Sequence, residues 1–75
     1  MEERYAEILR LEMLCMSEQT GALFGVSPAD RERGARNLKR NKAALHAALD
    51  ALSLEELEGF AAYRRAYKAE VAARR

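Results

Sequence analysis

Few side chains in this 75-residue chain have the type and spacing that metal binding needs. His46 and Asp50 are four residues apart, so on a helix they would face the same side and could supply two metal ligands. A zinc site usually takes about four ligands, and no second His or Cys stands near these two. We therefore expect no metal site and no cofactor.

The sequence also offers few candidate residues for nucleophilic or acid/base catalysis. Cys15 is the single cysteine, and its apolar neighbours predict a buried or interfacial thiol without an activating base. The acidic cluster at 55–58 is explained by its place at a helix start, which leaves no isolated carboxylate pair for acid/base catalysis. The glycines are dispersed and form no phosphate-binding loop. We expect no catalytic residue and no enzyme activity.

The composition predicts an all-α protein. Ala, Leu, Glu and Arg fill 45 of the 75 positions, a balance that favours helix over sheet. We expect three helices, over residues 2–24, 28–52 and 54–73, in a single helical domain covering 1–75. Short connections predict an up-down-up three-helix bundle, in which a helical hairpin packs with the long N-terminal helix.

Two short segments define the helix boundaries. In the first, Gly25 can end a helix in the left-handed conformation, Ser27 can cap the next helix, and Pro28 suits its first turn. In the second, Ser53 followed three residues later by Glu56 is a capping box. This second boundary is the most specific pattern in the chain.

The apolar spacing gives the expected core. In the second helix Leu38, Leu45 and Leu52 recur every seven residues, and Gly34 and Asn41 lie on the same stripe. Because Gly34 has no side chain, it would allow a close approach between helices. The third helix has an apolar face formed by Leu57, Phe60, Ala61, Tyr67 and Val71.

The first helix is apolar over most of its circumference. Its main face comprises Tyr5, Ile8, Leu9, Met16 and Leu23, and further apolar residues extend to the other side. Two neighbouring helices cannot easily cover so wide a surface, so we expect a homodimer or a bound partner to cover the rest. The residues assigned to this apolar contact are Leu11, Leu14, Cys15 and Met16.

Charge is unevenly distributed although the net charge is only +1. Residues 27–46 and 61–75 are basic, whereas 1–26 and 47–60 are acidic. In an up-down-up bundle the two basic segments would meet at one end. The expected partner-binding basic face consists of Arg33, Arg36, Arg40, Arg64, Arg65 and Lys68. It would bind an acidic protein surface, a nucleic acid, or only solvent.

The segment from Gly21 to Asp30 resembles the turn of bacterial helix-turn-helix DNA-binding domains. Gly21, Gly25 and Val26 stand where that pattern places a small residue, a glycine and an apolar residue. The resemblance implies a recognition helix from Pro28 that presents arginines to DNA. The chain departs from the pattern at Arg31 and Gly34, where the motif has apolar packing residues.

These observations lead to one functional hypothesis and one alternative. We expect a small non-enzymatic regulator that binds and inhibits or modulates a larger protein. Ten Arg against three Lys are typical of a bacterial or phage protein. The alternative is a nucleic-acid-binding transcriptional regulator that uses the segment around Gly25, Val26 and Ser27. The single cysteine and the absence of a long apolar run predict a cytoplasmic protein without a membrane partner.

Overall fold

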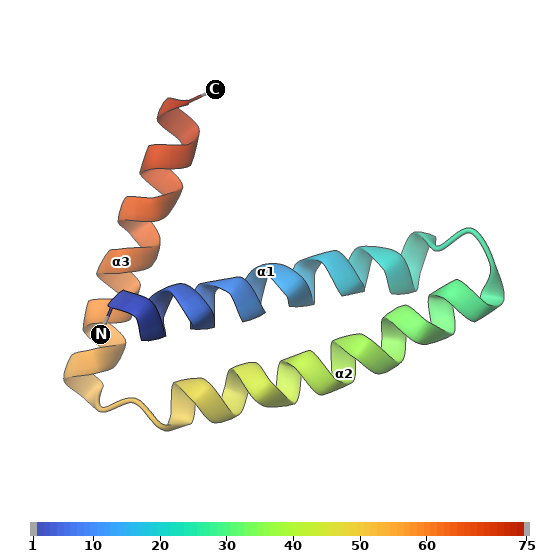
Figure 1. Cartoon of the computed structure of the whole chain (residues 1–75), viewed down its shortest axis with the longest axis horizontal. Coiled ribbons are helices and arrows are strands. Elements are labelled where there is room, and N and C mark those ends of the chain that lie inside the picture. Colours follow the sequence, from blue (N-terminus) through green and yellow to red (C-terminus); the bar gives the residue numbers. More distant parts are fainter. Residues whose placement is uncertain (1, 75) are drawn as a thin grey trace.

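The computed structural model describes residues 2–74 as three α-helices, with no strand among those residues. The helices are α1 (Glu2–Phe24), α2 (Pro28–Asp50) and α3 (Leu54–Ala73). The all-α prediction is confirmed, and only the second helix differs, ending two residues earlier than expected. Figure 1 shows α1 and α2 side by side and antiparallel, as a helical hairpin.

Both predicted N-caps are present. The Ser27 hydroxyl accepts a hydrogen bond from the backbone N–H of Asp30 at 3.1 Å. Ser53 and Glu56 form the complete capping box: the Ser53 hydroxyl accepts from the Glu56 N–H at 3.1 Å, and the Glu56 carboxylate accepts from the Ser53 N–H at 2.9 Å. The hydrogen bond from the Ser53 backbone holds the pKa of Glu56 below its ordinary value of 4.5.

The end of α1 differs from the prediction. No described residue, Gly25 included, has a positive φ, so α1 does not end in the left-handed conformation. Gly25 instead donates its N–H to the Gly21 carbonyl at 2.9 Å, and its own carbonyl accepts from the Arg31 guanidinium at 2.9 Å. A Cβ on Gly25 would lie 2.7 Å from the Gly21 oxygen and 3.0 Å from Arg31 Cγ. Gly25 is therefore needed for space rather than for backbone conformation.

The hairpin is packed differently at its two ends. Near the turn, a Cβ on Gly34 would lie 2.7 Å from the Ala22 backbone nitrogen, which confirms the predicted close approach of the helices. At the open end, large apolar side chains fill the space. The core there consists of Ile8, Leu9, Leu52 and Phe60, with Tyr5, Leu45, Ala48, Leu49 and Tyr63 packed against it.

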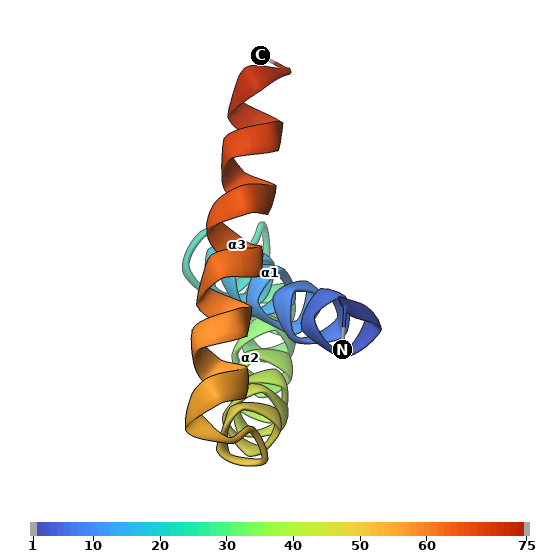
Figure 2. The same ribbon diagram turned by 90° about the vertical axis from the view of Figure 1, so that its left-hand side faces the viewer.

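α3 does not lie along the hairpin. It starts at the open end, where α1 begins and α2 ends, and its C-terminal half projects away from both helices (Figure 1 and Figure 2). The single chain therefore does not form the predicted up-down-up bundle. The described contacts that fix α3 come from its first eleven residues: the rings of Phe60 and Tyr63 each lie 5.9 Å from that of Tyr5, and Arg64 pairs with Glu12.

This arrangement leaves several expected core residues uncovered. Met16 and Leu23 were expected on the main buried face of the first helix, and Tyr67 on that of the third, yet all three are exposed. The physical reason is that α3 crosses only the first half of α1 and then leaves it (Figure 1). Within residues 2–74, none of the helices has an apolar stretch long enough to cross a lipid bilayer.

Candidate interaction surfaces

One apolar face of α1 is covered over its first half only. Tyr5 and Leu9 pack in the core beneath α3. Continuing at helical spacing, the same face carries Met13, Met16 and Leu23, all of which are exposed. We call these three residues the uncovered stripe. Met13 and Leu23 were not among the predicted contact residues, although the spacing from Leu9 onward would have identified them.

The turn between α1 and α2 extends the apolar surface. Phe24 and Val26 are exposed there, and Val26 lies almost completely in solvent. The Arg31 side chain folds back onto the Gly25 carbonyl and fixes the turn. Several exposed apolar side chains on one side of a small chain are typical of a binding site.

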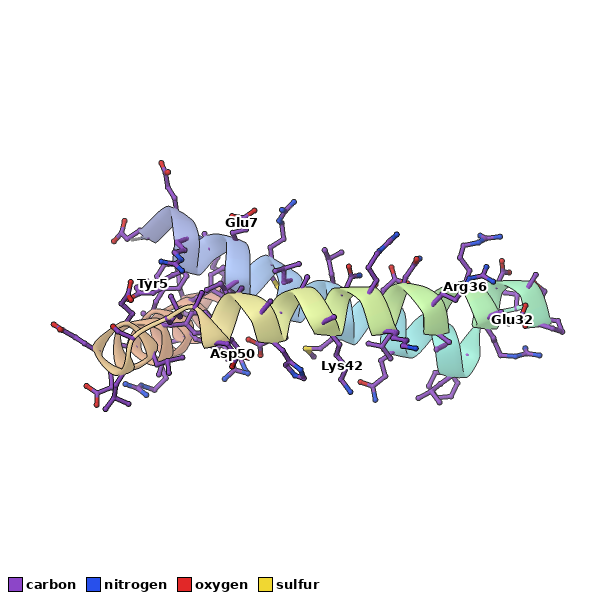
Figure 3. All side chains as sticks on the ribbon, turned by 90° about the horizontal axis from the view of Figure 1, so that it is seen from below. Tyr5, Glu7, Glu32, Arg36, Lys42 and Asp50 are labelled. Atoms are coloured by element: carbon purple, nitrogen blue, oxygen red, sulfur yellow. The ribbon has the colours of Figure 1, made fainter. Side chains whose placement is uncertain are left out.

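The opposite face of the hairpin has a different character. Glu7 projects from the side of α1 away from α3, whereas Lys42 projects from α2 to the other side (Figure 3). Leu14 lies two turns beyond Glu7 on the same side of α1 and is 39% exposed. We call the surface formed by Glu7, Leu11 and Leu14 of α1 the opposite face.

The predicted apolar contact residues are not one surface. Cys15 is buried, and Leu11 is half-buried. Leu14 and Met16 are both exposed, but two residues on a helix are about 200° apart, so they point to different sides of α1. The sequence indicated a wide apolar surface, and the structure divides it into a buried seam and two separate exposed faces.

The predicted basic residues are also divided within one chain. Arg33, Arg36 and Arg40 lie on α2 near the turn, while Arg64, Arg65 and Lys68 lie on α3 at the other side of the molecule (Figure 1). All are exposed except Arg64, which is half-buried. Their role in binding a partner stays a prediction.

Two of the α2 arginines have local partners. Arg33 lies 3.7 Å from the Asp30 carboxylate, and Arg40 donates to the Asn37 side-chain oxygen at 3.2 Å. Among the described residues, Arg36 forms neither an ion pair nor a side-chain hydrogen bond. Arg36 is thus the member of the α2 group most available to a partner.

Arg64 has a structural contact. Its Nε donates to both carboxylate oxygens of Glu12 at 2.9 Å, and a second guanidinium nitrogen pairs with the same carboxylate. These hydrogen bonds, together with the charge of Glu12, raise the pKa of Arg64 above its ordinary value. Arg64 therefore ties α3 to α1, whereas Arg65 and Lys68 stay exposed.

The chemistry considered for a small-molecule site has no geometric counterpart in the described part of the chain. No three His, Cys, Asp or Glu side chains among residues 2–74 come together as metal ligands would. His46 and Asp50 are both exposed on α2. No cavity is found within these residues.

The segment that resembles a helix-turn-helix is the turn of an antiparallel hairpin. α1 and α2 lie against each other along their length (Figure 1). DNA-binding helix-turn-helix motifs instead cross at about 90–120°, which frees the second helix to enter the major groove. Here the close contact of Gly34 with Ala22 holds α2 against α1.

No family model, curated protein or solved structure matches this chain significantly.

Proposed function

We propose that this protein is a non-enzymatic interaction module that binds a larger protein and regulates it, most simply by inhibition. The observation that carries the proposal is the uncovered stripe of Met13, Met16 and Leu23. It continues the face of α1 that α3 covers nearer the start of the helix. Contiguous exposed apolar side chains are characteristic of binding surfaces. Methionine side chains adapt their shape to a partner.

Charge indicates the chemistry of the partner. Lys42 projects from the side of α2 away from the opposite face, and Arg31 lies at the turn (Figure 3). Residues 27–46 carry six basic and two acidic side chains. We infer a partner with an apolar groove that accepts one helix face and has an acidic rim, to which the basic turn end of the hairpin is attracted.

The proposal includes self-association. In residues 2–74 the buried apolar side chains are few, namely Ile8, Leu9, Cys15, Leu52 and Phe60. Small domains with so little core usually need an additional source of stability. A homodimer would supply it.

The test is affinity capture from a nuclease-treated lysate with the tagged 75-residue chain, in which variants are compared. Met16→Glu places a charge in the uncovered stripe and should abolish capture of the partner. Ser17→Glu introduces the same charge at the next residue, which is also exposed, and should leave capture unchanged. Equal capture by both variants would contradict the proposal.

Nucleic acid is the alternative partner, and it would use the same basic residues. Contacts with phosphates make affinity fall steeply as salt increases. If nucleic acid were the partner, fluorescence anisotropy with a labelled mixed-sequence duplex would show tight binding at low salt. The triple variant Arg33→Glu, Arg36→Glu and Arg40→Glu would lose this binding. Because we propose a protein partner, we expect no binding of the duplex by the wild-type chain.

A further inference from the structure

We infer that the uncovered stripe binds an acidic amphipathic helix of the partner, which lies along α1 in the angle between the hairpin and α3. The inference rests on the proposed function and names the part of the partner's acidic rim that contacts this chain. The occupant is identified by the apolar spacing of α1 and by the charges that α2 and α3 place on the same side of the hairpin.

The bound helix would take the place that the third helix of an up-down-up bundle would fill. α3 crosses the hairpin at its open end and leaves the half near the turn free (Figure 1). There Met13, Met16 and Leu23 are exposed on one side of α1, at a spacing with which one helix packs on another. From Met13 to Leu23 is ten residues, or about 15 Å along the helix, which corresponds to about three turns of a bound helix.

α2 places Lys42 beside the stripe. The contact between Gly34 and Ala22 sets the register of the antiparallel hairpin, so Lys42, eight positions after Gly34, lies about level with the position eight before Ala22. Eight helical positions turn by about 80° from the direction of α1, so Lys42 projects sideways from the hairpin. Figure 3 shows it on the side opposite Glu7, which is the side of α3. Within residues 2–74 Lys42 is exposed and forms neither an ion pair nor a side-chain hydrogen bond.

α3 adds positive charge at one end of the stripe. Its two sides are distinguished by their contacts: Tyr63 packs on Tyr5 near the start of α1, whereas Arg64 binds Glu12, seven residues further along α1. The side of α3 that carries Arg64 therefore faces the turn and the uncovered stripe. Lys68 lies one turn after Arg64 on the same side and is exposed.

The acidic residues of α1 do not offset these charges. Between residues 10 and 24 they are Glu12, which Arg64 binds, and Glu18. Glu18 comes nine residues after Leu9, so it is turned by about 180° to the side of α1 away from the stripe. The surface therefore combines apolar side chains of α1 with a lysine of α2 along one edge and a lysine of α3 at one end. An amphipathic helix with carboxylates beside its apolar face complements all three.

Two other occupants fit less well. Residues 61–75 carry five basic and one acidic side chain, so the second half of α3, from this chain or from a second copy, would bring like charges next to Lys42. A nucleic acid would pair its phosphates with Lys42 and Lys68, but it would leave Met13 and Met16 against a charged backbone. The combination of apolar and basic side chains favours an acidic protein helix.

The first experiment measures the binding of two synthetic peptides to the 75-residue chain by fluorescence anisotropy. Both peptides form about four helical turns and carry leucines along one face. The acidic peptide has glutamates beside the leucines, and the basic peptide has lysines at the same positions. Only the acidic peptide should bind, and its affinity should fall as salt screens the charges.

The second experiment reverses single charges on the protein surface, where folding is not at risk. Lys42→Glu and Lys68→Glu should each raise the dissociation constant of the acidic peptide several-fold, because each replaces attraction by repulsion. Arg36→Glu is the matched control. Arg36 is also exposed on α2, but it is turned by about 200° from Gly34 and so points away from α1. This variant should bind the acidic peptide like the wild type.

Several results would overturn the inference. One is equal binding of the two peptides, or no binding of the acidic peptide up to millimolar concentration. Another is a loss of affinity in Arg36→Glu as large as that in Lys42→Glu. A labelled DNA duplex that binds more tightly than the acidic peptide and is lost in Lys42→Glu would assign the site to nucleic acid. A change of mass in Lys42→Glu would assign it to a second copy.

The proposed function is tested separately by capture from the lysate. Capture that is lost in Met16→Glu but unchanged in Lys42→Glu and Lys68→Glu would keep the protein partner and overturn the acidic helix. Selective binding of the acidic peptide without any capture that depends on Met16 would contradict the proposed function alone.

Discussion

The close contact of α1 and α2 near the turn can be tested by adding one methyl group. In Gly34→Ala the new Cβ would lie 2.7 Å from the Ala22 backbone nitrogen, whereas ordinary contacts begin at 3.4 Å. Because the obstacle is backbone, the two helices must separate by several tenths of an ångström. Overpacking of this kind costs about 1–3 kcal/mol.

Gly21→Ala is the matched control, because a Cβ on Gly21 meets nothing within 4 Å. Both substitutions replace a helical glycine by alanine, which alone favours the helix by up to about 1 kcal/mol. This gain largely cancels between the two variants, so Gly34→Ala should be less stable than Gly21→Ala by about 1–3 kcal/mol. For a domain of this size, each kcal/mol corresponds to about 4–8 °C in Tm.

The assay is thermal and urea denaturation followed by circular dichroism, with both variants at the same chain concentration because association contributes to stability. Gly34→Ala should melt below the wild type, and Gly21→Ala at or above it. If Gly34→Ala were as stable as Gly21→Ala, the helices would not be in close contact at this point.

Three further outcomes follow from the contacts of α3. Phe60→Ala should lower the free energy of unfolding by about 3–5 kcal/mol because the ring is only 7% exposed. Leu54→Ala, at a 75% exposed site, should change it by less than about 0.5 kcal/mol. Urea unfolding compares the two variants, and similar losses would contradict the assigned core. Glu12→Gln removes the charge that Arg64 pairs with, so the amides of α3 should exchange hydrogen faster, and unchanged exchange would mean that this contact does not hold α3. The lowered pKa of Glu56 means that its stabilising effect is complete above pH 4.5 and is lost as the pH falls through that lowered pKa. In Glu56→Gln the Tm should therefore fall less between pH 4.5 and lower pH than in the wild type. An unchanged fall of Tm in this acidic range would refute the contribution of Glu56.

The helices themselves could be predicted because their signals are local. The caps at Ser27 and Ser53 depend on residues within one turn, and both form as expected. Gly34 was identified as a site of close approach from its place on the leucine stripe of α2. These features need only the periodicity and the chemistry of neighbouring residues.

The direction of α3 could not be predicted in this way. Its apolar spacing continues through Tyr67 and Val71, as if the whole helix were packed. The direction is determined by side chains distant in sequence, since Tyr5 meets Phe60 and Glu12 binds Arg64. Because α3 leaves α1 after these contacts, the predicted basic residues of α2 and α3 lie on separate surfaces of the chain (Figure 1). The predicted apolar residues all lie on α1 and are separated by the angles between helix positions.

The most direct measurement is the mass of the 75-residue chain by size exclusion with light scattering, at low and moderate salt, with and without a mixed-sequence DNA duplex. We predict a mass of twice 8.5 kDa that the duplex does not change. A shift onto DNA that disappears as salt increases would contradict a protein partner and support the nucleic-acid alternative. A mass of one chain under all conditions would contradict the proposed homodimer.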